Sequence, residues 1–176
     1  MLSNFSARLL ASLGLLLSTT TLCAEEISAE YLVKAAFLYN FGLYTEWPLI
    51  PAETFDFCVL GKDTFGIFLD NIGKKPLQGK AIHIRRLPDN TDAKGCHLLF
   101  VPATAKDTYN RLAPMLLHQA TLTITDAQLM DERWPTMMVT MIPDGARFTF
   151  EINQTAAKTA GLTFSSKLLR LARKVK

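Results

Sequence analysis

Apolar residues recur along the chain at two spacings, one typical of helices and the other of strands. Between residues 28 and 44 they fall three or four positions apart, which predicts a helix that begins at Ser28 and ends before Trp47-Pro48. The apolar positions form two faces: Leu32, Ala35, Tyr39 and Leu43 on one, and Val33, Phe37, Phe41 and Tyr44 on the other. A helix that is apolar around most of its circumference must be covered on both sides. We therefore expect either the rest of the domain or a second subunit to cover it.

Short apolar runs bounded by turn residues predict the strands of a sheet. They occupy residues 55–60, 81–87, 96–101, 121–125, 137–142 and 147–152. The run 96–101 is apolar at nearly every position, which is typical of a strand covered on both faces. The segment Pro143-Asp144-Gly145-Ala146 predicts the turn of a hairpin between the last two strands.

Further helices are predicted between and after these strands, at residues 64–72, 105–119, 154–160 and 165–174. Asp63 or Thr64 is the expected N-cap of the first of them, and Ser165 that of the last. Pro114 is expected to break the second, and Gly161 to stop the third. Strands and helices alternate first, and a hairpin follows. This order predicts an α/β fold: a single domain with a mixed sheet of about six strands, flanked by about five helices, with a C-terminal β-hairpin.

The first 24 residues have the order of a cleavable export signal. Arg8 supplies the positive charge, residues 9–17 form the apolar run, and Leu22-Cys23-Ala24 supplies a small residue for cleavage. The apolar run is about half of the ~20 residues that a helix needs to span a bilayer, which argues against a permanent anchor. We therefore expect residues 1–24 to be removed as a signal peptide, leaving one domain over residues 25–176 that works outside the cytoplasm.

Two other interpretations of this segment stay open. It could form an N-terminal helix of the folded domain, although it has no amphipathic stripe. Cys23 could instead carry a lipid, although the large Leu22 stands where a small residue is normally needed. A lipid would tether the protein to a membrane.

The charge balance excludes one class of partner. A net charge of +3 over 176 residues is too small to imply nucleic acid as a target. The basic residues are not evenly spread, because five of them lie in the last ten positions: Lys167, Arg170, Arg173, Lys174 and Lys176. We interpret them as a solvated helix end, where cations suit the helix dipole, in preference to a surface for membranes or phosphate.

Two cysteines remain after the expected cleavage, Cys58 and Cys96. An even number in an exported chain predicts a disulfide, with two free buried thiols as the alternative. The bond would close a loop of about 38 residues and contribute roughly 3–4 kcal/mol to stability in the chain-entropy model.

A search for catalytic or metal-binding residues finds none with a specific pattern. The three histidines, His83, His97 and His118, lack metal-ligand spacing, so structural roles are favoured over a zinc site. No G-x-S-x-G elbow is present, and neither an enzyme nor a cofactor is expected. The Gly61–Thr64 turn is interpreted as a plain strand–helix turn rather than an anion site, and Asp126 as a helix cap. The pairs Trp47-Pro48 and Trp134-Pro135 are assigned to turns and packing, with a partner anchor as the alternative.

Several segments taken together resemble the YfiR-like family of periplasmic proteins. They are Lys34–Phe41 continuing to Glu46-Trp47-Pro48, then Cys58–Gly61, Cys96–Val101, Thr121–Asp126, Arg147–Asn153, and Gly161-Leu162 through Ser165–Ala172. Each segment alone is mostly a packing pattern, but the ordered set is specific and covers nearly the whole expected domain. The chain departs from the family's pattern at residues 130–136, where relatives tend to carry a glycine-containing turn.

The resemblance implies an α/β fold, frequent homodimers and a regulatory role. Family members restrain a membrane-bound diguanylate cyclase from the periplasmic side, and an outer-membrane lipoprotein can sequester them. This protein would then bind the cyclase's periplasmic sensor domain and control cyclic-di-GMP output and biofilm formation. Cys58 and Cys96 match one family disulfide, whereas a second family disulfide has no counterpart here.

Six residues near the hairpin and the last helix are the candidates for contact with the partner: Glu151, Asn153, Leu162, Phe164, Lys167 and Arg170. The alternative is that Leu162 and Phe164 belong to the core and that the charged residues are only solvated. A second hypothesis is a periplasmic small-molecule sensing or solute-binding domain that uses the loops near Gly61 and Asp126. An exported hydrolase is a third and weaker one.

Overall fold

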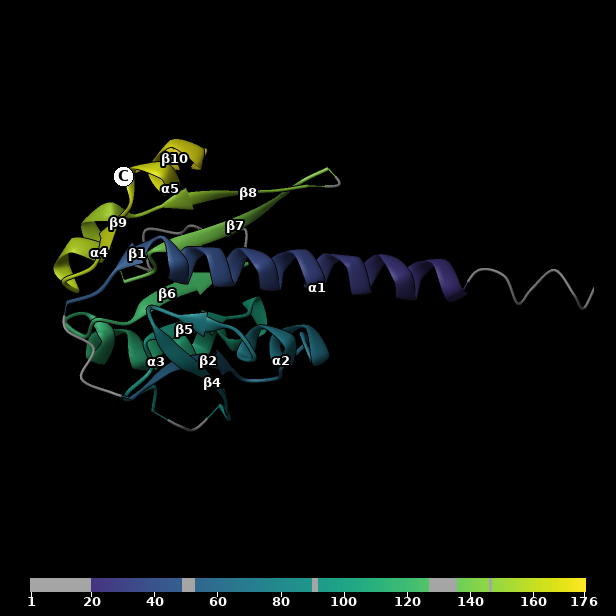
Figure 1. Cartoon of the computed structure of the whole chain (residues 1–176), viewed down its shortest axis with the longest axis horizontal. Helices are drawn as coiled ribbons and strands as arrows, with labels where there is room; N and C mark the ends of the chain where they lie inside the picture. Colours follow the sequence, from purple (N-terminus) through teal and green to yellow (C-terminus); the bar gives the residue numbers. More distant parts are fainter. Residues whose placement is uncertain (1–19, 49–52, 90–91, 127–135, 146) are drawn as a thin grey trace, which may run out of the picture.

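The computed structural model describes residues 20–48, 53–89, 92–126, 136–145 and 147–176, with side chains from Ala29 onward. Figure 1 shows the arrangement of their helices and strands. The helices are α1 (Thr20–Leu43), α2 (Ile67–Gly73), α3 (Lys106–Leu116), α4 (Gln154–Thr159) and α5 (Ser166–Leu171), with a 3₁₀ turn at Ala103–Ala105. The strands are β1 (Thr45–Glu46), β2 (Thr54–Leu60), β3 (Pro76–Leu77), β4 (Lys80–Leu87), β5 (Leu98–Val101), β6 (Leu122–Thr125), β7 (Val139–Asp144), β8 (Arg147–Ile152), β9 (Thr163–Phe164) and β10 (Lys174–Val175).

One sheet of eight strands organises the domain, in the order β10-β8-β7-β6-β5-β2-β4-β3. Five neighbouring strands of the sheet pair in parallel: β4, β2, β5, β6 and β7. At the two sides of this group, β8 pairs antiparallel with β7, and β3 pairs antiparallel with β4. The predicted α/β class, mixed sheet and C-terminal hairpin are therefore confirmed. The count of about six strands was low, because β3 and β10 extend the sheet and β1 and β9 form a separate pair.

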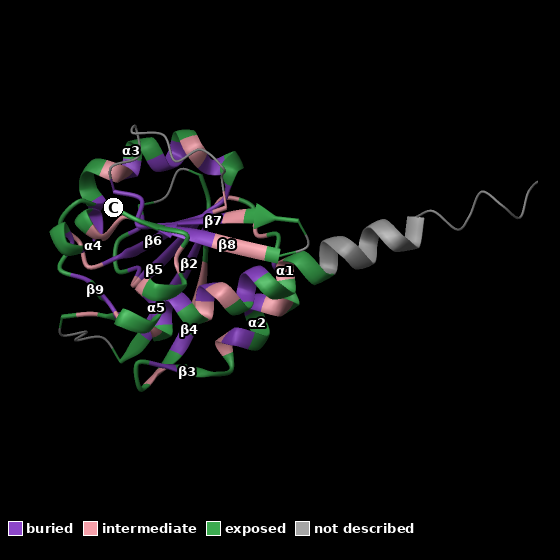
Figure 2. Ribbon diagram, turned by 90° about the horizontal axis from the view of Figure 1, so that it is seen from above, coloured by how far each residue is buried: buried purple, intermediate pink, exposed green. Residues whose placement is uncertain are grey.

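The sheet is covered on both faces, as predicted for its central strands. In β5, Leu98 and Phe100 join the larger part of the core, which also contains buried residues of α1 and α2. Leu99 and Val101 join a second cluster with Tyr109 of α3. Successive side chains of a strand point to opposite faces, so a short strand that is buried throughout must lie between two layers. Figure 2 shows the buried strands between these layers of helices.

The first helix differs from its prediction in both length and buried face. Its backbone is helical from Thr20 rather than from Ser28, and it ends at Leu43, ahead of Trp47-Pro48. The buried stripe runs through Ala35, Leu38 and Phe41. The predicted grouping into two apolar faces was therefore wrong, because a single stripe between them meets the core. The expected signal peptide lies mostly outside the described residues, as does the side chain of Cys23.

The second and third helices correct two smaller predictions. Helix α2 begins after Gly66 and has no side-chain cap; the Asp63 carboxylate instead accepts hydrogen bonds from the N–H groups of Phe65 and Gly66, one turn earlier. Helix α3 continues through Pro114 to Leu116. A proline removes the bond to the carbonyl four residues before it, and Asn110 at that position is exposed and can bond to water.

The C-terminal segment follows its predicted caps but not its predicted end. As predicted, Ser165 caps α5 and Gly161 follows α4 with a positive φ of 76°. Asn153 caps α4, which was not predicted from the sequence. Helix α5 stops at Leu171, three residues earlier than expected, and β10 then pairs in parallel with β8. The Arg173 N–H donates to the Phe150 carbonyl and the Lys176 N–H to the Ile152 carbonyl, so the sheet takes up backbone groups that a longer helix would have used.

The hairpin turn is tighter than the sequence suggested. Antiparallel pairing between β7 and β8 continues to Asp144 and Arg147, so Pro143 lies within β7. Gly145 follows with a positive φ of 59°, a conformation that suits glycine in a short hairpin loop. The two strands consequently reach beyond the rest of the sheet (Figure 1).

Candidate interaction surface

The predicted disulfide is present between Cys58 of β2 and Cys96, which lies just before β5. The two Cα atoms are 5.9 Å apart and both side chains are buried. Closing a loop of this length contributes about 4 kcal/mol in the chain-entropy model. A buried disulfide of this kind is typical of proteins outside the cytoplasm.

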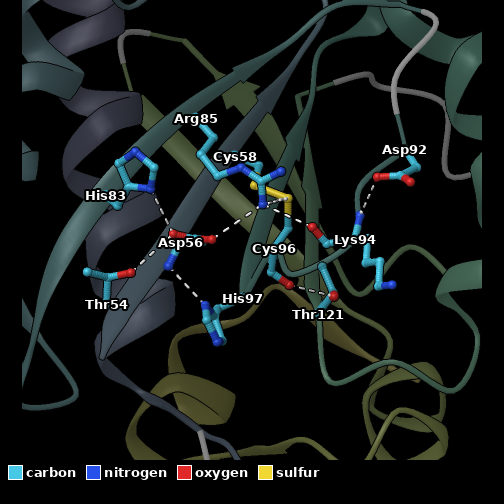
Figure 3. The surroundings of a disulfide bond; sticks show 10 residues. All are labelled: Thr54, Asp56, Cys58, His83, Arg85, Asp92, Lys94, Cys96, His97 and Thr121. Atoms are coloured by element: carbon cyan, nitrogen blue, oxygen red, sulfur yellow. Dashed lines mark hydrogen bonds and ion pairs between the residues drawn. A yellow bond between two sulfur atoms is a disulfide. The ribbon is translucent and has the colours of Figure 1, made fainter. Parts of the chain in front are cut away.

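Asp56 organises the polar groups around the disulfide (Figure 3). Its carboxylate accepts a hydrogen bond from Arg85 at 3.3 Å and lies 3.0 Å from His83 Nδ1, while its backbone N–H donates to His97 Nδ1 at 2.9 Å. Arg85 also donates to the Lys94 carbonyl at 3.0 Å and lies 3.9 Å from Cys96 Sγ. These contacts tie the strands β2 and β4 to the segment that carries Cys96.

Two of the three histidines form contacts within the fold. Because His97 Nδ1 accepts a hydrogen bond, its ring is neutral there, and burial lowers the pKa of the imidazole below its usual value. His83 pairs with Asp56, and His118 lies just beyond α3 and is exposed. Within the described ranges, no group of three or more His, Cys, Asp or Glu side chains is arranged to hold a metal ion.

A buried ion pair joins α1 to the end of β6. Lys34 Nζ lies 2.7 Å from the Asp126 carboxylate and also pairs with Glu30, one helical turn before it. The rings of Tyr31 and Phe148 lie 5.1 and 5.4 Å from the same ammonium group. The expectation that Asp126 caps a helix concerns the residues that follow it, and residues 127–135 lie outside the described residues. Lys34 and its aromatic neighbours were not proposed from the sequence as candidate functional residues. The signal that could have pointed to Lys34 was its position four residues after a glutamate in an otherwise apolar helix.

Burial and charge act on Lys34 in opposite directions. Removal from water lowers the pKa of its ammonium group, but the hydrogen bonds and charges of Asp126 and Glu30 outweigh this, so the pKa is raised above its usual value. Lys34 is therefore charged at neutral pH. It fixes the middle of α1 against the carboxyl end of the sheet, the edge where α/β folds commonly carry functional groups.

The outer side of α1 leaves apolar side chains uncovered. Leu32, Val33 and Leu43 are 54%, 41% and 44% exposed, and Ile67 at the start of α2 is 66% exposed. Between the two helices lies a groove of about 300 Å³, lined by Leu32, Ala35, Ala36, Tyr39, Asn40, Phe68, Asn71, Ile72 and Lys75. From the sequence, we expected either the rest of the domain or a second subunit to cover this helix. The domain covers only one side of it. The uncovered side remains available to a second subunit or another partner.

The six candidate contact residues occupy different environments near the C-terminal edge of the sheet. Leu162 and Phe164 are buried in the core. Glu151 is also buried and pairs with Arg173 at 2.6 Å, while the Asn153 side chain caps α4. Lys167 and Arg170 are exposed on α5. The structure therefore brings the six into one region but presents only these two fully to solvent.

Two other features have structural roles. Trp47 is half-buried, and its ring N–H donates to the Ala120 carbonyl at 2.9 Å, which fits the packing role expected for it; Trp134 lies outside the described residues. Gly61 adopts a positive φ of 72° in the turn after β2, and a Cβ there would lie 3.1 Å from the Asp89 carboxylate.

In the part of the chain that the structure describes, no helix is long and apolar enough to cross a membrane.

A family model described as YfiR/HmsC-like matches residues 31–173, from the middle of α1 to the residue before β10. A search of curated proteins finds no match.

Proposed function

The chain belongs to the YfiR/HmsC-like family, and from this premise we propose that it is a periplasmic, non-enzymatic regulator that binds and represses a membrane-bound diguanylate cyclase. Repression lowers cyclic-di-GMP and with it biofilm formation. The observation that carries the proposal is the family match over residues 31–173, which spans nearly the whole fold. The buried Cys58–Cys96 disulfide supports the compartment, because such bonds persist where the surroundings are oxidising.

Repression by binding requires a difference in affinity between two states of the cyclase. If the regulator binds the inactive state of the periplasmic sensor domain tenfold more tightly than the active state, it shifts their equilibrium by about 1.4 kcal/mol. The contact candidates are the six residues at the C-terminal edge, and Lys167 and Arg170 are the best placed because they are exposed. Sequestration by an outer-membrane lipoprotein would compete for the same regulator and relieve repression.

The regulator is further proposed to act as a homodimer. The uncovered apolar side chains of α1, Leu32 and Val33, support this arrangement. A second copy would bury them and provide the cover that the domain itself does not give.

The groove between α1 and α2 favours a second candidate function, a small-molecule sensing or solute-binding domain. Its volume of about 300 Å³ is at the lower end of the range for ligand sites, and it combines apolar walls with Asn40, Asn71 and Lys75. Screening nucleotides and amino acids by thermal shift tests this function. A saturable rise in melting temperature supports it, and no rise with any compound argues against it.

Capture from solubilised membranes tests the leading proposal. The tagged protein is incubated with cell membranes in a neutral detergent, and the eluate is assayed for conversion of GTP to cyclic-di-GMP. We expect a cyclase to co-elute and its activity to fall saturably as more of the regulator is added. Failure to retain any cyclase, or retention with no change in its activity, contradicts the proposal.

A matched pair of variants tests the candidate contacts in the same experiment. The double variant Lys167→Glu and Arg170→Glu reverses two exposed charges on α5, while Lys62→Glu with Lys94→Glu reverses two exposed charges elsewhere. The first pair is expected to weaken capture at least about tenfold, because removing charges from an interface costs more than 1 kcal/mol in total. Equal capture of both variants excludes these two residues as contacts.

A further inference from the structure

The last ten residues form a charged surface that differs from the solvated helix end expected from the sequence. Four cations, Lys167, Arg170, Lys174 and Lys176, are exposed and form no ion pair with any described residue. Leu171 lies among them and is 71% exposed, the highest value of any large apolar side chain described. These five residues are here called the C-terminal basic surface. Arg173 is not part of it, because it pairs with Glu151.

The helix dipole does not account for this group of cations. Helix α5 has six residues and ends at Leu171, so Lys174 and Lys176 lie beyond it. Lys174 belongs to β10, and a strand contributes almost no net dipole. The charges therefore gather at this edge of the sheet without an intramolecular reason visible in the fold. Figure 1 shows α5 and β10 together beside the C terminus at this edge.

The backbone holds the surface in a fixed shape. Lys167, Arg170 and Leu171 are spaced three and four residues apart, which places them on one side of α5, while Leu168 on the other side is buried. Ser165 caps this helix by accepting from the Leu168 N–H at 3.3 Å. Beyond the helix, the Lys176 N–H donates to the Ile152 carbonyl at 2.9 Å, and its carbonyl accepts from Gln154 at 2.8 Å. The cations are thus presented by ordered backbone rather than by a loose tail.

Cations around a protruding leucine match the chemistry of an anionic lipid surface. Clusters of four to eight Lys or Arg residues bind such surfaces, with each cation near the surface contributing about fivefold in affinity. The long side chains adapt to lipid phosphates that have no fixed positions, and a leucine among them can enter the headgroup region. We propose that the C-terminal basic surface docks the protein reversibly on a bilayer rich in anionic phospholipids.

This inference goes beyond the proposed function, because it concerns where the protein is held rather than which protein it represses. A regulator of a membrane-embedded partner works next to a bilayer, and docking would raise its concentration where that partner lies. Lipid docking needs no cyclase, so a failure of either proposal leaves the other standing.

Vesicle binding tests the proposal with matched variants. The protein, purified in the form that cells accumulate after export, is sedimented with vesicles of phosphatidylglycerol and phosphatidylcholine in equal parts. The test variant carries Lys167→Ser, Arg170→Ser, Lys174→Ser and Lys176→Ser. The control variant carries Lys62→Ser, Lys74→Ser, Lys80→Ser and Lys94→Ser, and so has the same net charge. Neutral phosphatidylcholine vesicles give the background, and circular dichroism checks that both variants are folded.

We expect the test variant to bind anionic vesicles more than about tenfold more weakly than the native protein, and the control variant to stay within about threefold of it. Native binding should fall as salt rises from about 0.05 to 0.5 M, and Leu171→Ser should weaken binding at every salt concentration. Equal binding of the two variants to anionic vesicles overturns the proposal. It is also overturned if the native protein binds anionic vesicles no more strongly than neutral ones. Loss of cyclase capture in detergent by the test variant, together with no native vesicle binding, would assign the surface to an acidic protein instead.

Discussion

Asp56 is the residue on which the surroundings of the disulfide depend. It holds His83 and Arg85 with its carboxylate and His97 with its backbone N–H, so one residue of β2 orders three neighbours from two other segments. The contact with His97 Nδ1 requires a ring nitrogen without a proton. This requirement gives the fold a defined dependence on pH.

His97 should make the folded state less stable in acid. Burial lowers the pKa of its imidazole, and the cations Lys80 and Arg85 act in the same direction against the attraction of Asp56. In the unfolded chain the pKa returns to about 6.5. The stabilising effect is therefore fully present above about pH 6.5 and is lost as the pH falls through the lower, folded-state value. We expect His97→Gln to lose less stability than the native protein between about pH 7 and 5, measured by urea unfolding. If both proteins lost the same amount of stability as the pH falls, this role of His97 would be contradicted.

Thr140 of β7 offers a test at a single buried atom. Its side chain is fully buried, and its hydroxyl has no hydrogen-bond partner among the described residues. Replacing an unpaired buried hydroxyl by a methyl group of similar shape removes a desolvation cost. We expect Thr140→Val to raise the free energy of unfolding by about 1 kcal/mol.

Thr123 supplies the matched control for that change. It is equally buried, but its hydroxyl donates to the Thr136 carbonyl at 2.6 Å and accepts from the Met138 N–H at 3.1 Å. Thr123→Val should therefore lower the free energy of unfolding by about 1–3 kcal/mol. If both variants are destabilised to the same extent, the hydroxyl of Thr140 has a partner after all.

At the scale of elements, the Lys34–Asp126 pair fixes α1 on the sheet. The two residues are 92 positions apart, and the ammonium group is nearly inaccessible to solvent. Breaking a buried pair from one side leaves an uncompensated charge, whereas replacing both partners by apolar residues is often neutral. The pair is therefore better understood as a lock on the position of α1 than as a large source of stability.

A three-variant comparison tests this lock by chemical denaturation. We expect Asp126→Ala to cost about 2–4 kcal/mol, because Lys34 stays buried with only the half-exposed Glu30 as partner. The double variant Lys34→Met with Asp126→Leu should recover most of that loss. Glu30→Gln, which removes the exposed partner, should cost under about 1 kcal/mol. A double variant as unstable as Asp126→Ala would show that the charges themselves stabilise the fold.

Most elements of four or more residues were predictable from the sequence, and the two-residue strands were not. The apolar run of β5 and the turn before β8 predicted those strands because burial on two faces and hairpin geometry leave clear patterns. Strands β1, β3, β9 and β10 have two residues each, too few for any periodicity, and exist because a neighbour offers backbone hydrogen bonds. Helix α5 ends early for the same reason, because the residues that follow it form backbone hydrogen bonds with β8.

The candidate site could be predicted only in part, because contacts between distant segments leave no local pattern in the sequence. The even number of cysteines left after the expected cleavage sufficed to predict the Cys58–Cys96 disulfide, since two cysteines allow one pairing. The pair Lys34–Asp126 could not be anticipated, because nothing local in either segment specifies a partner 92 residues away. For Leu162 and Phe164, sequence alone left contact and core roles equally open, and the structure buries both.

At the scale of the whole molecule, the uncovered side of α1 is the feature that a monomer does not explain. Leu32 and Val33 are both more than two-fifths exposed on a helix whose other side is in the core. Sedimentation equilibrium should show a dimer for the native protein and a monomer for Leu32→Glu with Val33→Glu, because a buried unpaired carboxylate opposes association. Leu171→Glu changes an exposed leucine elsewhere and should leave the dimer intact. A native monomer, or a dimer in all three proteins, would contradict this surface.

The central claim is that the protein represses cyclic-di-GMP synthesis from outside the cytoplasm. The measurement that tests it most directly is the cyclic-di-GMP content of cells that lack the gene, carry it on a plasmid, or carry a version without residues 1–24. The account predicts a rise on deletion, a return to the original level with the full chain, and no return with the version that lacks residues 1–24. An unchanged cyclic-di-GMP level after deletion would contradict it.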